Sequence, residues 1–295
     1  MLLFLCNVKF EKWHTPNSKA YSLIDFGNGE KLERFGEVVL IRPEPLARNR
    51  PLRDQEWWLQ QAHARFNQTS ATSGMWESLK EHPNSWVVRY PLSEGAFAFK
   101  LKLTKFKHVG VFPEQASNWN FIQNSCSSLQ NPKILNLFAY TGGASLAAKA
   151  AGADVIHVDS IRQVIDWSNE NQQLSKIDGI RWVVEDALKF ILRESKRGRK
   201  YHGIIMDPPA WGRGPKGERW KLESKLDDLL KAAGNILLPE GFAVINTYSS
   251  MVLDTLKDKA ALHFPDHHRE SRKLSLKSEQ GWWIDTGCVC RVSPI

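Results

Sequence analysis

The sequence contains little cysteine and no long hydrophobic run. Four cysteines occur in 295 residues, too few for the disulfide framework of a small secreted protein. Cys288 and Cys290 are separated by one residue, which is not the spacing of a redox pair. No apolar run approaches the ~20 residues that cross a bilayer, and the apolar opening Met1–Cys6 lacks the basic region and cleavage site of a signal peptide. We therefore expect a soluble protein of the reducing cytoplasm.

The sequence also lacks a strong charge imbalance. Lys and Arg number 40 against 32 Asp and Glu, a net charge of +8. Residues 1–125 and 126–295 each carry half of this excess. A nucleic-acid partner and a surface charged only for solubility both agree with such a value, so charge alone does not choose between them.

The first 125 residues are rich in predicted strands. Apolar and alternating runs predict strands at Tyr21–Phe26, Val38–Ile41, Trp86–Tyr90 and Ala96–Leu103. Gly27–Gly29 form a tight turn between the first two of these strands, and Asp54–Phe66 is a candidate helix. These residues are expected to form a small β-rich domain.

From residue 133 short apolar runs alternate with helix-forming stretches. Strands are predicted at 133–138, 155–158, 182–184, 203–206 and 242–245. Helices are predicted at 144–151, from a Ser160 cap to about 174, from the third strand to about 195, and at 222–235 and 251–262. Such alternation builds a doubly wound, mainly parallel α/β sheet. Runs at 270–276 and 283–292 predict a terminal antiparallel hairpin, and residues 126–295 form the second domain.

Three loops at the carboxyl ends of these strands carry suggestive residues, and ligands of such sheets bind at that edge. The first loop, Asn136–Ser145, has adjacent glycines that let a ligand approach the backbone. Asp159 ends the next strand, where an acid accepts ribose hydroxyls, and Glu185 with Asp186 follow the third, where an acid accepts an adenine amino group. Turn glycines and helix-start acids are the plain alternatives. Together, the three loops predict a site for an adenosine-containing ligand.

The glycine pattern limits which ligand this is. A dinucleotide needs G-x-G-x-x-G around its pyrophosphate, whereas Gly142 and Gly143 are adjacent and no third glycine follows. This weakens a nicotinamide or flavin cofactor. S-adenosylmethionine has no phosphate and needs only space for its amino-acid end.

The stretch Met206–Gly212 follows the fourth strand and reads M-D-P-P-A-W-G. Two prolines fix the backbone and remove two N–H donors, so the Asp207 carbonyl and carboxylate are presented as acceptors for an amino-bearing base. Trp211 offers a stacking face, as extruded bases require. A rigid surface turn is the alternative interpretation.

Together, N-L-F-A-Y-T-G-G and D-P-P-x-[FWY] resemble the class I S-adenosylmethionine-dependent methyltransferases with their seven-stranded sheet. More narrowly, they resemble the branch that contains the large-subunit ribosomal RNA cytosine-C5 and guanine-N7 methyltransferases and their uncharacterised relatives. Residues 106–115 are similar to the K-T-G-F-F-x-D-Q stretch of that branch, and residues 31–36 and 42–45 fit it as well. The resemblance implies that residues 126–295 form the catalytic domain, while residues 1–125 serve substrate or RNA recognition.

The resemblance also implies roles for individual residues. Tyr140, Thr141 and Gly142 would line the methionine end of the cofactor, Asp159 the ribose and Asp186 the adenine. The full set of expected cofactor residues is Asn136, Phe138, Tyr140, Thr141, Gly142, Gly143, Asp159, Ser160, Glu185, Asp186 and Asp207. The expected catalytic set is Asp207, Pro208, Pro209, Trp211 and Tyr248.

The sequence departs from this branch after the fifth strand. Cytosine-C5 members place a nucleophilic Cys there, but residues 246–250 read N-T-Y-S-S, with Tyr248 near that position. A phenol with a pKa of about 10 is a poor substitute for a thiolate. A nitrogen acceptor is therefore favoured. The amino-terminal part also shows no PUA-type RNA-binding module.

Basic residues cluster in two places. Arg213, Lys216, Arg219 and Lys221 follow the D-P-P loop, and Lys196, Arg197, Arg199 and Lys200 form a compact run. Both sets are candidate contacts for an RNA backbone, and a solvated surface explains either equally well.

We therefore predict an S-adenosylmethionine-dependent enzyme that methylates a nucleobase nitrogen in RNA, most simply ribosomal RNA. No metal is required, and no metal-ligand spacing appears. A protein or small-molecule acceptor, a nicotinamide oxidoreductase on a similar sheet and a non-catalytic RNA-binding protein are the alternatives.

Overall fold

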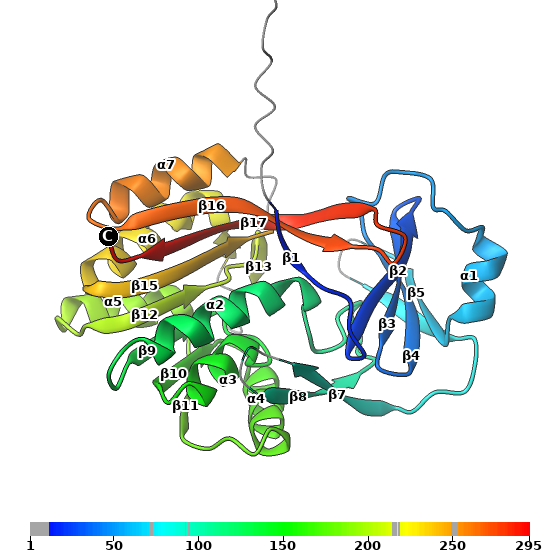
Figure 1. Cartoon of the computed structure of the whole chain (residues 1–295), viewed down its shortest axis with the longest axis horizontal. Coiled ribbons are helices and arrows are strands. Elements are labelled where there is room, and N and C mark those ends of the chain that lie inside the picture. Colours follow the sequence, from blue (N-terminus) through cyan, green and yellow to red (C-terminus); the bar gives the residue numbers. More distant parts are fainter. Residues whose placement is uncertain are drawn as a thin grey trace, which may run out of the picture.

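The chain forms a β-rich lobe from its first hundred residues and an α/β lobe from the rest (Figure 1). This arrangement comes from a computed structural model, which describes residues 12–70, 73–91, 93, 95–213, 217, 219–248 and 253–295. No helix among these residues has the length and hydropathy needed to cross a membrane. The predicted apolar opening Met1–Cys6 lies outside the described residues.

The α/β lobe is built on an eight-stranded sheet. Its order is β1 (Trp13–Thr15), β16 (His268–Lys277), β17 (Trp283–Ser293), β15 (Leu237–Thr247), β12 (Tyr201–Met206), β9 (Lys133–Leu137), β10 (Asp154–Asp159) and β11 (Ile180–Val184). Only β17 runs against its neighbours, which confirms the doubly wound sheet and the terminal hairpin. The predicted seven strands are all present. The eighth, β1, comes from the amino-terminal part and pairs parallel with β16.

Helices cover both faces of this sheet (Figure 1). One face carries α2 (Ala116–Ser127), α3 (Gly143–Ala150) and α4 (Arg162–Leu174), and the other carries α5 (Ala187–Lys196), α6 (Leu222–Ile236) and α7 (Leu253–His263). Each helical layer packs on the sheet through its own apolar core. Two such layers are expected in a doubly wound sheet, because right-handed crossovers place helices on both faces. The predicted start of α7 at Met251 lies outside the described residues.

The β-rich lobe contains a five-stranded sheet and a hairpin. The sheet runs β2 (Tyr21–Gly27), β3 (Glu30–Phe35), β4 (Val38–Pro43), β5 (Ala64–Gln68), β6 (Gly74–Ser78), with α1 (Gln55–Gln61) before β5. The hairpin pairs β7 (Ser85–Pro91) with β8 (Ala96–Lys102), and β8 lies against α4. A short 3-10 helix, η1 (Pro113–Gln115), leads from this lobe into α2.

Several predicted elements need correction. The Gly27–Gly29 turn joins β2 to β3, a strand that the prediction omitted, rather than to β4. The predicted helix at 54–66 ends at Gln61, because residues 64–68 form β5 instead. Ser160 does not cap α4; Ile161 holds that position without a side-chain bond. The predicted boundary at residue 125 falls inside α2, and the division into two domains stays a prediction.

Candidate functional site

The loop after β9 is held in an unusual backbone conformation. Phe138 and Tyr140 have positive φ angles of 55° and 48°, which cost non-glycine residues of the order of 1–3 kcal/mol each. Tyr140 N donates to Oδ2 of Asp159 at 3.0 Å, and the Thr141 hydroxyl donates to the Gly110 carbonyl at 2.7 Å. Gly142, with φ 96°, caps α3 without a side chain, so the helix N-terminus is uncovered. Strain of this kind marks a functional loop.

This loop forms one wall of a pocket at the carboxyl ends of β9, β12 and β15. The enclosed space measures about 50 Å³, enough for a small polar group. The predicted residues that line it are Asn136, Phe138, Tyr140, Thr141, Gly142, Gly143 and Asp207. Phe112, Gln115 and Trp119 close it from η1 and α2. We call this space the loop pocket.

The acids predicted for ribose and adenine lie outside the loop pocket. Both carboxylate oxygens of Asp159 accept backbone N–H groups, from Tyr140 and Ile161 at 3.0 Å each, and burial raises its pKa. Asp186 is the N-cap of α5 and accepts from Lys189 N at 2.8 Å. Glu185 forms an ion pair with Arg193. These acids thus share the sheet edge with the pocket while serving local structural roles.

Asp207 lies at the centre of the site. Its Oδ1 accepts a 2.7 Å hydrogen bond from Asn246, and its Oδ2 accepts a 3.3 Å bond from Gln115. Burial raises the pKa of Asp207 to about 7, although the Asn246 bond lowers it. The following Pro208 is buried and Pro209 is exposed. The D-P-P loop therefore presents a carboxylate that changes protonation near neutral pH.

Two further residues belong to this site but were absent from the predicted set. Asn246 lies one residue before the end of β15 with 1% exposure, and its Oδ1 has no hydrogen-bond partner among the described residues. Gln115 also donates a 2.9 Å hydrogen bond to the Tyr248 hydroxyl. The strand-end rule that selected Asp207 would also have found Asn246. Gln115 lay inside the quoted stretch 106–115, but its contacts depend on tertiary structure.

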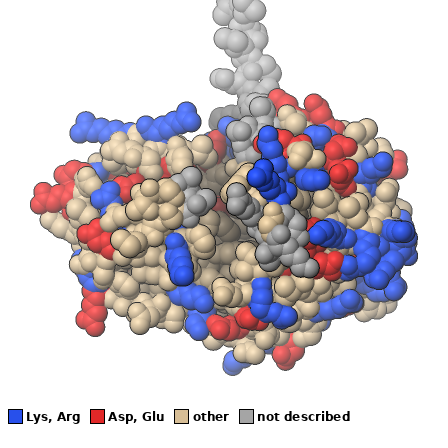
Figure 2. Space-filling model, turned by 180° about the vertical axis from the view of Figure 1, so that it is seen from behind, with Lys and Arg blue, Asp and Glu red and all other residues tan. Residues whose placement is uncertain are grey.

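A second, larger cavity of about 600 Å³ lies between the lobes, and Figure 2 shows a hollow between them with Lys and Arg side chains near its rim. Pro209, Ala210 and Tyr248 line it from the α/β lobe. Its other lining residues include Lys31, Arg42, Glu44, Lys107, Glu114, Lys273 and Cys288. Phe112 lines both spaces. We call this space the interlobe cavity; its size suits a small ligand or one nucleotide.

The D-P-P loop continues into a small hairpin, β13 (Trp211–Arg213) with β14 (Arg219–Lys221). Trp211 is 57% exposed and pairs across the hairpin with Lys221. The neighbouring Trp220 faces the body instead: its ring packs on Phe138, and its Nε1 donates to the Pro209 carbonyl at 2.6 Å.

Two of the predicted RNA-contacting cations, Arg219 and Lys221, lie on strand β14 of this hairpin. Arg219 and Lys221 are exposed, and no ion pair in the described part of the chain involves them. The predicted Lys216 lies outside the described residues, and Arg213 belongs to β13. An aromatic ring and two cations therefore lie on the hairpin that continues from Pro209 and Ala210, which line the interlobe cavity.

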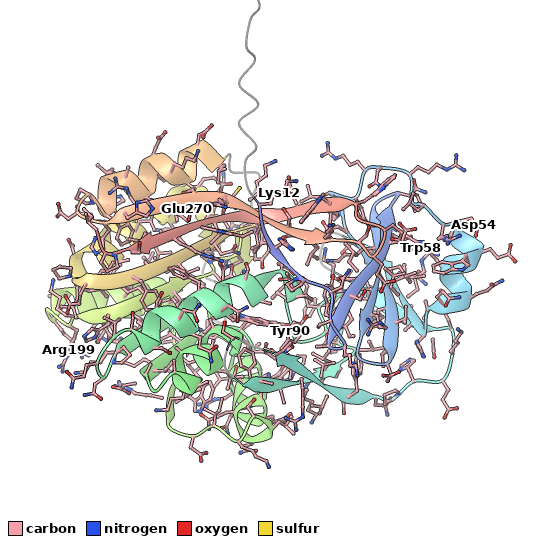
Figure 3. All side chains as sticks on the ribbon, in the orientation of Figure 1. Lys12, Asp54, Trp58, Tyr90, Arg199 and Glu270 are labelled. Carbon is pink, nitrogen blue, oxygen red and sulfur yellow. The ribbon has the colours of Figure 1, made fainter. Side chains whose placement is uncertain are left out.

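The basic run at 196–200 lies at the opposite end of the sheet. It precedes β12, whereas Asp207 follows that strand, so the two are separated by about 20 Å at ~3.3 Å per residue. Arg197 pairs with Glu194 at 3.2 Å. Figure 3 shows Arg199 at the edge of the α/β lobe remote from the β-rich lobe.

The strand order, the single reversed strand and the strand-end pocket define a doubly wound α/β protein with a ligand-sized space at the carboxyl ends of its strands. The chain matches the family model of S-adenosylmethionine-dependent methyltransferases over residues 60–275. It is also similar to the crystal structure of the S-adenosylmethionine-dependent methyltransferase from Agrobacterium tumefaciens, with 35% identity and a TM-score of 0.89 over 97% of this chain and 94% of that chain. The chain therefore belongs to the S-adenosylmethionine-dependent methyltransferase family.

Two more distant likenesses add detail. Ribosomal RNA large subunit methyltransferase K/L of Syntrophotalea carbinolica is 30% identical over 163 residues, which cover 54% of this chain and only 22% of that protein. The crystal structure of SMU.776 complexed with SAH has the same fold, with 18% identity and a TM-score of 0.73. The match covers 94% of this chain and 76% of that chain. The cofactor of this family is S-adenosylmethionine, which sets aside the nicotinamide alternative.

Proposed function

We propose that this methyltransferase acts on a nucleobase nitrogen in RNA, with ribosomal RNA as the first candidate. The observation that carries the proposal is the continuity of one segment: the D-P-P loop contributes to both spaces and runs directly into the β13–β14 hairpin. Trp211 there offers a ring for base stacking, and Arg219 and Lys221 offer phosphate contacts. The name of the Syntrophotalea relative supports the same acceptor.

The residues present fit S-adenosylmethionine. The uncapped N-terminus of α3, the unpaired Asn246 Oδ1 and the apolar ring of Phe112 surround the loop pocket, which suits a charged amino-acid end and a sulfonium methyl. We propose that the loop residues Asn136, Phe138, Tyr140, Thr141, Gly142 and Gly143 hold that end. Asp159 with Ser160 would face the ribose, and Glu185 with Asp186 the adenine. A carboxylate has about four lone-pair sites, so Asp159 and Asp186 retain acceptor capacity.

When bound, the cofactor supplies a methyl group on an activated sulfonium, so the protein mainly positions the acceptor and excludes water. Asp207 accepts hydrogen bonds from the acceptor base through its carboxylate and its carbonyl. Pro208 and Pro209 hold the loop rigid, Tyr248 borders the acceptor in the interlobe cavity, and Trp211 stacks on the base. Gln115 fixes the positions of Asp207 and Tyr248 relative to each other through its two hydrogen bonds.

The site favours nitrogen over cytosine carbon. Carbon methylation requires a thiolate nucleophile, and Cys288 lines the interlobe cavity from β17 rather than from the loop after β15. Burial raises the pKa of the Cys288 thiol, whereas nucleophilic cysteines have a lowered pKa.

The test is methyl transfer from tritiated S-adenosylmethionine to total RNA from cells that lack the gene, followed by nucleoside analysis. We expect label in one N-methylated nucleoside of large ribosomal RNA. Label found only in protein or in small molecules would overturn the RNA assignment and support the corresponding alternative acceptor.

A further inference from the structure

A network of buried charges forms the wall of the interlobe cavity on the β-rich lobe. Glu33, which is fully buried, accepts hydrogen bonds from Arg42 Nε at 2.8 Å and from Tyr21 at 2.8 Å. Lys31 lies 3.3 Å from the same carboxylate and 3.5 Å from that of Glu44. Although burial opposes ionisation, the cations Arg42 and Lys31 hold the pKa of Glu33 below its ordinary value. Glu33 is thus fully paired and has a structural role.

Glu114 in η1 borders the same network but is not paired in this way. It is 5% exposed and lines the interlobe cavity, yet it forms no ion pair within the described part of the chain. Burial raises its pKa, although Lys31 and Arg42 oppose this shift. A buried carboxylate with a raised pKa and no partner cation is a potential proton acceptor.

The position of Glu114 links the two spaces of the site. Its neighbour Gln115 lines the loop pocket and binds both Asp207 and Tyr248. Glu114 itself is a hydrogen-bond partner of Tyr248. Burial is the main cause that raises the pKa of that phenol and of Asp207, and the charge of Glu114 adds to both shifts. The Glu114 carboxylate therefore lies in the interlobe cavity, one residue from the wall of the loop pocket.

We propose that Glu114 is a catalytic residue that takes up the proton lost by the acceptor nitrogen. This inference rests on the proposed function and narrows its substrate: the acceptor nitrogen carries hydrogen before the reaction, as in an exocyclic amino group or a ring N–H. A ring nitrogen without hydrogen has no proton to give.

The electron pair on the acceptor nitrogen forms the N–CH₃ bond, and the pair of the broken S–CH₃ bond returns to sulfur. The N–H proton passes to the carboxylate of Glu114, and solvent receives it after the product leaves. Base assistance of this kind contributes about 10²–10⁴-fold to a rate.

The rate is expected to rise with pH as Glu114 loses its proton, because only the carboxylate accepts one. Several charged groups face it and set that pH. From the β-rich lobe they are Tyr21, Lys31, Glu33, Arg42 and Tyr90, and from the α/β lobe they are Asp207 and Tyr248. Charged or titratable groups that line the cavity near it are Glu44, Lys107, His108, Lys273 and Asp285.

The experiment compares Glu114→Gln with Glu194→Gln. Glu194 is a matched control, because it lies on α5 away from the site, is 7% exposed and accepts a 2.7 Å hydrogen bond from Tyr201 of β12. Extract from gene-deleted cells, separated into RNA, protein and small molecules, is the acceptor for tritiated S-adenosylmethionine. Calorimetry with S-adenosylmethionine checks that each variant is folded and binds the cofactor.

We expect E114Q to lose about 100-fold or more in rate with cofactor affinity unchanged, while E194Q keeps its rate. The methylated nucleoside should be one whose nitrogen carried hydrogen. An E114Q protein with the wild-type rate and pH profile, or a product methylated at a hydrogen-free ring nitrogen, overturns the role of Glu114. Label confined to protein overturns the RNA proposal instead. In that case the rate of E114Q relative to wild type in the protein fraction tests the role of Glu114.

Tyr248→Phe supplies a second measurement if E114Q does not fold. Loss of the phenol removes a hydrogen-bond donor from the ionised carboxylate, which raises its pKa. The acidic limb of the pH–rate profile should move to higher pH, whereas a purely structural role of Tyr248 would lower the rate without moving that limb.

Discussion

Asn246 donates a 2.7 Å hydrogen bond to the carboxylate of Asp207 while its own Oδ1 stays unpartnered among the described residues. Asn246 lies one residue before the end of β15, and Asp207 directly follows the adjacent strand β12. A buried amide oxygen without a partner costs free energy, and such a cost is typical of a site prepared for a ligand's N–H group. Both residues of the pair line the loop pocket.

The raised pKa of Asp207, about 7, predicts a pH-dependent gain in stability for Asp207→Asn. An ordinary carboxyl has a pKa of about 3.9 in the unfolded chain, so between these values the folded state holds a proton that the unfolded state has lost. Stability therefore falls as pH rises through this window. Asn cannot ionise, so D207N should raise Tm relative to wild type at about pH 8 and little at about pH 4. Thermal unfolding at both pH values measures this; an equal effect at both would contradict the buried, shifted carboxyl.

Gly143 is predicted to control cofactor affinity. A Cβ at this position would lie 2.8 Å from the Trp119 ring, which lines the loop pocket. Overpacking costs about 1–3 kcal/mol, so Gly143→Ala should weaken S-adenosylmethionine binding by about tenfold. Gly212→Ala is the control, since its Cβ would meet nothing closer than 3.7 Å. Calorimetry that found equal affinities for the two variants would remove the loop pocket from the cofactor site.

Arg219 and Lys221 are predicted to contact RNA phosphates, unlike the run at 196–200. Each alanine substitution should weaken binding of ribosomal RNA and lower the slope of log affinity against log salt by about one. Arg199→Ala, at the far edge of the sheet (Figure 3), should leave that slope unchanged. Binding measured over a salt series decides between the clusters, and a slope that responds only to Arg199 would reverse the assignment.

Substitution of Cys288 distinguishes methylation of a nitrogen from methylation of cytosine carbon. Nitrogen methylation needs no thiol, so Cys288→Ser should keep methyl transfer within about twofold of wild type. A covalent cytosine-C5 mechanism loses essentially all activity when its nucleophile is removed. Single-turnover rates with labelled cofactor distinguish these outcomes, and a dead C288S protein that still binds the cofactor would revive the carbon acceptor.

The α/β sheet could be predicted from the sequence because its inner strands are buried on both faces and appear as continuous apolar runs, as in Lys133–Leu137. Strand β3 was not predicted because its sequence is mostly charged. Its sequence E-K-L-E-R-F looks solvated, but Lys31 and Glu33 are buried because they pair with each other and because Glu33 also pairs with Arg42. The β13–β14 hairpin is too short to give a pattern.

The strand-end rule located the glycine loop and Asp207, which the structure brings together in one pocket. It could not show that the carboxylates of Asp159 and Asp186 already bind backbone N–H groups. Nor could it find Gln115 and Glu114, because η1 reaches the site through the packing of α2 against the sheet. Contacts between segments this far apart in sequence are not encoded in a local pattern.

We propose that the protein methylates an RNA nucleobase that is held by Asp207. Nucleoside mass spectrometry of large ribosomal RNA tests this most directly. Cells lacking the gene would be complemented with the wild-type chain or with Asp207→Ala, a variant first shown to bind S-adenosylmethionine. We predict that one N-methylated nucleoside is absent in the deletion strain, returns with the wild-type chain and stays absent with D207A. A D207A protein that restores the nucleoside fully, or ribosomal RNA identical in all strains, would contradict the account.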